Sequence, residues 1–80
     1  MAYAAARMAE LLLLRGDAAH ASQVAHAGLK THPDHPGLLV QSAYALMARG
    51  RLAQAVEDAR KATTVAAQQP DGWRVLGEVL

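Results

Sequence analysis

The sequence contains no cysteine and no phenylalanine, and its aromatic residues are one tryptophan and two tyrosines among 80 residues. Without cysteine, disulfide bonds and thiolate metal sites are excluded. The shortage of aromatic residues leaves little material for a bulky core, and a chain of this length makes at most one small domain. We therefore expect a single domain over residues 1–80 whose core is built from short aliphatic side chains.

An excess of charge of one sign is also missing, as are long apolar runs. Eight basic and seven acidic residues give a net charge of +1, so no strong field attracts nucleic acid or an anionic membrane. The longest run of large apolar residues, Leu11–Leu14, is far shorter than a membrane span, and its flanks do not fit a signal peptide. We expect neither a nucleic-acid nor a membrane partner. The sequence does not identify the cell compartment, and the cytoplasm is the default expectation.

The residues that catalysis requires are sparse. The two serines, Ser22 and Ser42, fall inside expected helices without an adjacent His–Asp arrangement. There is no glycine-rich phosphate loop and no obvious pair of carboxylates for acid–base chemistry. His20 and His26 fall on different sides of one helix and the other two histidines lie in a proline turn, so we interpret all four as solvated residues. We expect no enzymatic activity, no cofactor and no metal.

Alanine and other strong helix formers dominate the chain, whereas the residues that favour strands are sparse. Glycine and proline interrupt the helix-forming sequence at Gly16, at 33–36, at Gly50 and at Pro70. Each interval is long enough for a helix of a globular protein. We predict five helices, over residues 2–15, 18–31, 36–49, 52–68 and 70–80.

Particular residues suit the ends of these helices. Gly16 and Gly50 are placed to end a helix with a positive φ, which costs glycine nothing. Asp17 can cap the second helix by accepting a hydrogen bond from a first-turn N–H, whereas Arg51 gives the fourth helix no such cap. The β-branched run Thr63–Val65 weakens the fourth helix near its end.

The pattern repeats with a step of 34 residues. This step separates Pro36 from Pro70 and Gly16 from Gly50. Small residues recur at the same step, and a small side chain lets two helix axes approach to roughly 8 Å. The recurring small residues are Ala9, Ala43 and Gly77; Ala21 and Ala55; Ala25 and Ala59; Gly28 and Ala62. We therefore divide the domain into a first unit over 2–35, a second over 36–69 and a partial third, with its first helix only, over 70–80.

This pattern resembles the tetratricopeptide repeat family. The segment Trp73-Arg74-Val75-Leu76-Gly77 looks like the Trp-x-x-Leu-Gly opening of that family's unit, and Pro33 stands at its unit-ending proline. The sequence departs from the family where Ala5 and Leu39 replace the opening tryptophan of the two complete units. The resemblance implies an all-α fold, a right-handed superhelical stack of antiparallel helix pairs with five helices, and a role in protein–protein interaction.

The resemblance also implies a concave groove lined by the first helix of each unit, where members of the family bind peptides or partner helices. Projected onto this sequence, the groove residues are Tyr3, Ala6, Glu10, Leu13, Gly37, Val40, Gln41, Tyr44, Met47, Asp71, Arg74 and Glu78. Such a groove is mostly apolar and suits an amphipathic helix or an extended apolar peptide. Tyr44 and Met47 would be its anchors, or Tyr44 packs against the adjacent helix instead.

The last helix has no partner helix after it in the sequence. About three repeats are usually needed to bury their apolar faces, so we expect the chain to be a segment of a longer array or, as the alternative, to pair with a copy of itself. Such an oligomer end would involve Val75, Val79 and Leu80. Two further functions stay open beside the interaction scaffold. In the first, the chain is a structural or oligomerisation segment of a larger repeat protein. In the second, it is a regulatory appendage of an enzyme that lies outside these residues.

Overall fold

A computed structural model describes residues 2–80, which form five α-helices and, within that range, no strand. The helices are α1 (Ala2–Leu14), α2 (Ala18–Thr31), α3 (Pro36–Ala48), α4 (Leu52–Val65) and α5 (Pro70–Val79). The predicted all-α class and the number of helices are confirmed. None of these helices is both long and apolar enough to cross a membrane.

The turns after α1 and α3 share one geometry. Gly16 and Gly50 adopt φ angles of 81° and 77°, as predicted for residues that end a helix. After α1, the Asp17 N–H donates to the Leu12 carbonyl at 2.9 Å, and after α3 the Arg51 N–H donates to the Leu46 carbonyl at 2.9 Å. This pairing satisfies carbonyls that the last turn of each helix leaves without an intrahelical donor.

Side chains cap the N-terminal ends of two helices, α2 and α3. The Asp17 carboxylate accepts a hydrogen bond from the His20 N–H at 3.2 Å, which confirms the predicted cap of α2. At α4, Arg51 makes no side-chain cap, also as predicted. His35 caps α3, because its Nδ1 accepts the Leu38 N–H at 3.2 Å, a role that the sequence analysis did not assign to it. His35 therefore has a structural role at the start of α3.

Helix α4 is shorter than predicted, since it ends at Val65 and not at residue 68. The hydroxyls of Thr63 and Thr64 both donate to the Arg60 carbonyl, at 2.7 and 3.0 Å. Bonds of this kind, from a hydroxyl to a carbonyl three or four residues earlier, slightly destabilise a helix, and the β-branched run weakens it further. The predicted weakening at Thr63–Val65 thus becomes the end of the helix.

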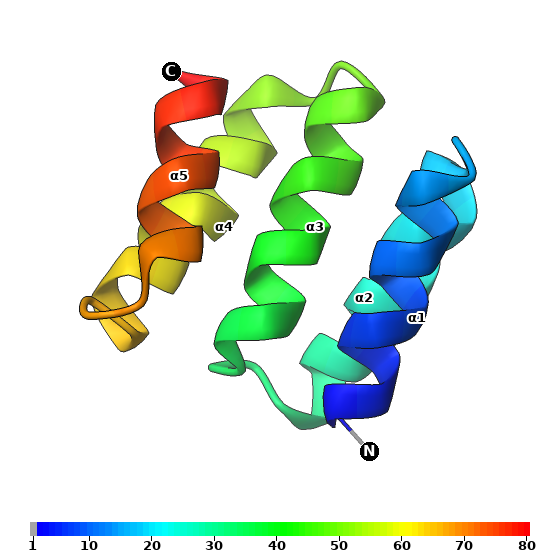
Figure 1. Ribbon diagram of the computed structural model, residues 1–80, viewed down its shortest axis with the longest axis horizontal. Helices are drawn as coiled ribbons and strands as arrows, with labels where there is room; N and C mark the ends of the chain where they lie inside the picture. Colours follow the sequence, from blue (N-terminus) through cyan, green and yellow to red (C-terminus); the bar gives the residue numbers. More distant parts are fainter. Residues whose placement is uncertain (1) are drawn as a thin grey trace.

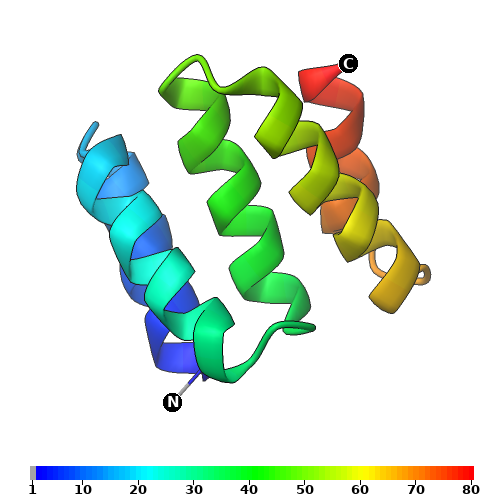
Figure 2. The ribbon, with the colours of Figure 1, turned by 180° about the vertical axis from the view of Figure 1, so that it is seen from behind.

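The helices lie in two layers with α3 in the middle. Figure 1 views the molecule from the side on which α1 and α5 lie, and Figure 2, turned around, has α2 and α4 in front. Helix α3 contacts the other four helices, α1 also contacts α2, and α4 also contacts α5. Between residues 2 and 80, the backbones of α1 and α2 do not approach those of α4 and α5 closely. The central helix therefore holds the two outer pairs together.

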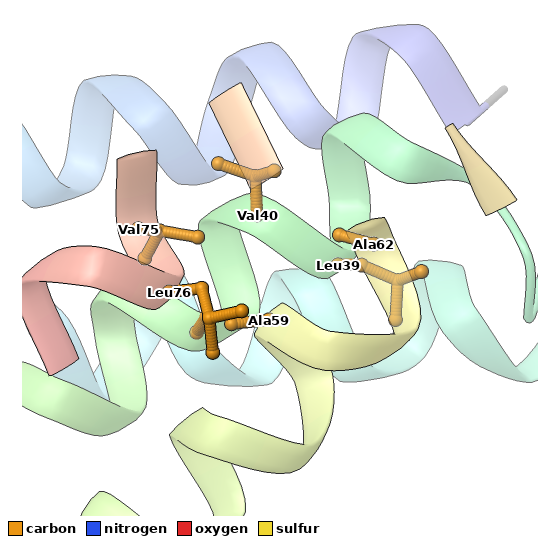
Figure 3. Close-up of a cluster of buried hydrophobic side chains, with 7 residues drawn as sticks. Leu39, Val40, Ala59, Ala62, Val75 and Leu76 are labelled. Carbon is orange, nitrogen blue, oxygen red and sulfur yellow. The ribbon is translucent and has the colours of Figure 1, made fainter. Parts of the chain in front are cut away.

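Two clusters of buried side chains make up the core. One lies among α3, α4 and α5 and is shown in Figure 3; its buried members are Leu39, Val40, Ala43, Ala59, Ala62, Val75 and Leu76. The other joins α1, α2 and α3 through Ala9, Ala21, Ala25 and Ala45. Alanines from the 34-residue pattern are thus buried where helices meet. At Gly72 a Cβ would lie 3.2 Å from Ala62, so α5 begins in close contact with α4.

A buried polar contact joins α3 to α4. The Ser42 hydroxyl, which is fully buried, donates to the Asp58 carboxylate at 2.6 Å. Among the described residues, every buried side-chain nitrogen or oxygen has a hydrogen-bond partner. Because an unsatisfied buried polar group is costly, this complete pairing is consistent with a well-formed interior.

Two glycine-to-alanine substitutions should have effects of opposite sign on stability. Gly50→Ala forces a side chain into the left-handed region and should lower the free energy of unfolding by about 1 kcal/mol. Gly77→Ala adds a methyl group to an exposed helical position with nothing within 4 Å, and should raise it by up to about 1 kcal/mol. Urea unfolding followed by circular dichroism measures both. Equal effects of the two substitutions would contradict this account of the turn.

Candidate partner-binding groove

A cavity of about 530 Å³ opens between α1, α3 and α5. Its lining residues fall at helical spacing on each of these elements, so each helix contributes one face. They are Glu10, Leu13 and Leu14 from α1; Val40, Gln41, Tyr44, Met47 and Ala48 from α3; Asp71 and Arg74 from α5. The packing of α1 and α5 on opposite flanks of α3 therefore creates the hollow.

The surface of the groove is largely apolar. Val40 is buried, whereas Leu13, Tyr44 and Met47 are half-buried, so their side chains pack against the fold and still reach the cavity. Tyr44 also packs against the core cluster of α3, α4 and α5. The two interpretations of Tyr44, as a packing residue and as a groove residue, are therefore compatible.

Charged residues lie on the two outer helices of the groove. Glu10 comes from α1, and Asp71 and Arg74 come from α5. Outside the lining residues, Arg7 Nη1 lies 2.9 Å from Glu10 Oε1, and both side chains are largely exposed. Such an exposed pair contributes at most about 1 kcal/mol and is easily exchanged for another partner. These charged side chains are therefore available for polar contacts beside the apolar surface.

The Tyr44 phenol is the titrating group that the groove perturbs most. Burial and, after it, the neighbouring Glu78 carboxylate raise the pKa of Tyr44 to about 12. A carboxylate near the hydroxyl favours the neutral phenol, which can donate a hydrogen bond, over the charged phenolate. Tyr44 consequently keeps its proton through the neutral range and offers the groove an aromatic ring with one polar atom.

The structure brings together most of the residues projected onto the groove. Eight of them line the cavity: Glu10, Leu13, Val40, Gln41, Tyr44, Met47, Asp71 and Arg74. Tyr3, Ala6, Gly37 and Glu78 do not. Tyr3 is 77% exposed and lies two turns before Glu10, the first lining residue of α1. Ala6 is buried facing Gly37, where a Cβ would lie 3.4 Å from it. The projection therefore extends too far toward the N-terminus of α1.

Two lining residues, Leu14 and Ala48, were not among the projected ones. Each lies four residues after a projected residue of the same helix, Leu14 after Glu10 and Ala48 after Tyr44. Residues four apart lie on the same face of a helix, so this spacing was the available signal.

The three residues assigned to an oligomer end lie in different environments. Val75 is fully buried in the cluster of α3, α4 and α5, so it offers no surface to a second chain. Val79 is half-buried against the same cluster, and Leu80 is exposed. The expected end is therefore corrected at Val75, which faces inward because α5 packs on α3 and α4.

Ser22 lies beside a histidine, a contact that the sequence analysis did not anticipate. The hydroxyl of Ser22 lies 3.3 Å from His26 Nδ1, and Arg49 Nη1 donates to the same hydroxyl at 3.4 Å. Ser22 is buried, so this hydroxyl is closed to a substrate. The contact instead ties α2 to the end of α3.

The remaining polar contacts of the histidines are local. His20 Nδ1 lies 2.6 Å from Asp17 Oδ2, and this hydrogen bond from His20 lowers the pKa of Asp17. Across residues 2–80, no three or more histidines and carboxylates come together as a metal site would require.

Comparisons with models of protein families, with curated proteins and with solved structures find no match to this chain.

The perturbed phenol gives the groove a measurable pH dependence. The Tyr44 proton leaves near pH 10 in the unfolded chain and near pH 12 in the folded one. Its contribution to the free energy of unfolding is therefore complete below pH 10 and is lost as the pH rises to about 12. Tyrosinate absorbance, taken as the difference between the parent chain and Tyr44→Phe, isolates this titration. Glu78→Gln should lower the pKa, and an unchanged titration would contradict the assigned role of Glu78.

Proposed function

We propose that this chain is a protein-interaction scaffold that binds a peptide or an amphipathic helix in the groove between α1, α3 and α5. The observation that carries the proposal is the largely apolar lining of that cavity, with Leu13, Tyr44 and Met47 half-buried at its surface. Aromatic residues and methionine are enriched where proteins bind other proteins. A cavity of about 530 Å³ is large enough for apolar side chains of a partner.

The proposal includes the arrangement of the helices. We infer a right-handed superhelical stack of antiparallel helix pairs, similar to that of the tetratricopeptide repeat family. It is supported by the 34-residue recurrence of prolines and glycines and by contacts that link the outer helix pairs only through α3. In such a stack the first helices of successive units share one side, and a groove along them is the natural place for an elongated partner.

The chemistry of the groove favours a helical partner with large apolar residues on one face. An amphipathic helix presents such residues at spacings of three and four, which match a surface that is itself built from helices. The charges of Glu10, Asp71 and Arg74 flank the apolar surface and would contact the polar side of that helix. Their mixed signs set no strong preference for an acidic or a basic partner.

The proposal is tested by selecting binders from a library of randomised helical peptides of about 15 residues, a length at which helices begin to be stable. Selected peptides should carry large apolar residues at three- and four-residue spacing. Tyr44→Ala should weaken the binding of these peptides by about 30-fold, the factor that corresponds to about 2 kcal/mol for an interface anchor.

The matched control is Tyr3→Ala, which removes the other tyrosine from α1, outside the groove. This variant should bind the same peptides as the parent chain, and circular dichroism should show that both variants stay folded. Equal binding by the parent chain and Tyr44→Ala, measured by calorimetry, would refute the groove as the binding site.

A further inference from the structure

The outer face of α5 carries a second apolar surface, separate from the groove. Trp73, Gly77 and Leu80 are spaced four and three residues apart, so they form one stripe along the helix. Trp73 and Leu80 are 53% and 76% exposed, and a Cβ built at Gly77 meets nothing within 4 Å. We call these three residues the α5 stripe. Asp71 and Arg74, which line the groove, lie on a different face of the same helix.

The same stripe exists in α3, where it is covered. Moving back by 34 residues, Trp73, Gly77 and Leu80 correspond to Leu39, Ala43 and Leu46. Leu39 is 2% exposed, Leu46 is 3% exposed and Ala43 is fully buried. Two helices of one chain thus carry the same large–small–large pattern, and only in α3 is the pattern buried.

The helix that packs against the α3 stripe shows what kind of element fits. Leu39 and Ala43 share a buried cluster with Ala59 and Ala62 of α4 (Figure 3). The small residues of α4, with Ala55 one turn earlier, follow each other at four- and three-residue spacing and are all buried. A row of small side chains lets the large residues of the facing helix pack deeply and brings the two axes close.

The same row of small residues occurs in α2. Ala21, Ala25 and Gly28 precede the three small residues of α4 by 34 positions. Ala21 and Ala25 are buried in the cluster that joins α1, α2 and α3. Within this chain, then, both second helices of a unit cover a neighbour by means of small residues at this spacing.

Trp73 is held in position before any partner arrives. Its indole N–H donates to the Ala67 carbonyl at 2.8 Å, which fixes the ring against the turn between α4 and α5. More than half of the residue remains exposed nonetheless. A side chain already fixed in one conformation loses less entropy when a partner covers it.

We propose that the α5 stripe is a docking site for a helix that carries alanine or glycine at positions i, i+4 and i+7, the pattern of α2 and α4. The packing of α4 on the corresponding stripe of α3 supplies the matching geometry. A second copy of this chain is the poorer fit, because its own rows of small residues on α2 and α4 are already buried.

The test supplies such a helix. A second copy of residues 47–69 is added after Leu80, which continues the 34-residue step because Leu80 corresponds to Leu46. The only tryptophan of the chain, Trp73, then reports on its own burial. The fluorescence emission of the extended chain should shift to shorter wavelength, and its melting temperature should rise above that of the 80-residue chain.

Two control variants make the test specific. In the first, the added counterparts of Ala55 and Ala59 are replaced by leucine, which preserves helix propensity but removes the row of small residues. In the second, Gly77→Leu places a large side chain at the centre of the stripe. This substitution should be tolerated in the 80-residue chain, where nothing lies within 4 Å, and should abolish the emission shift in the extended chain.

Three outcomes would overturn the proposal. The first is an extended chain whose Trp73 emission and melting temperature equal those of the 80-residue chain. The second is an equal shift with the leucine-substituted extension, which would mean that any apolar cover suffices. The third is a dimer of the 80-residue chain in sedimentation with Trp73 already buried, which would assign the stripe to a second copy. Peptide binding by the groove depends on none of these results, so failure here is distinguishable from failure of the proposed function.

Discussion

The close approach of helices at alanine and glycine is the constraint on which this structure depends. The fully buried large side chains are few, with Leu38, Leu39 and Val75 foremost among them. Alanine itself buries little apolar area, so its contribution lies in what it allows. Where Ala59 and Ala62 meet α3 and α5, the backbones come close enough for Leu39 and Val75 to be enclosed. Leu38 lies instead against Gly28 of α2, where an added Cβ would be 2.9 Å from it. A chain this poor in aromatic residues would otherwise have a loosely packed core.

The groove follows from the same constraint. Helices α1 and α5 each pack against α3, and α2 and α4 lie behind them (Figures 1 and 2). The faces of α1, α3 and α5 that the second layer does not cover therefore meet at the cavity. Its residues are not required for the small-residue contacts, so large side chains such as Tyr44 and Met47 can occupy them. The placing of small residues where helices cross, and of Tyr44 and Met47 in the groove, is a consequence of how the layers pack.

Much of this could be predicted from the sequence, because glycine and proline act locally. Gly16, Gly50 and Pro36 fix helix ends through their own backbone preferences, and the predicted ends agree there to within one residue. The end of α4 at Val65 has no glycine or proline to mark it, and only the β-branched run Thr63–Val65 weakens the helix there. For the groove, helical spacing identifies a face but not how far along the helix the neighbouring helices enclose it. That length depends on packing between distant segments, which is why the projection of the groove included Tyr3 and omitted Leu14.

The groove and the α5 stripe differ in the partner that each can accept. The groove is a hollow whose half-buried side chains leave a cavity, so it has space for large residues of a partner. The α5 stripe is the reverse, because Trp73 and Leu80 project from it and Gly77 alone leaves a gap. Only a helix with small residues facing those two side chains can bring its backbone close to it. Shape therefore separates the two surfaces although both are apolar, and a helix suited to one would be a poor fit for the other.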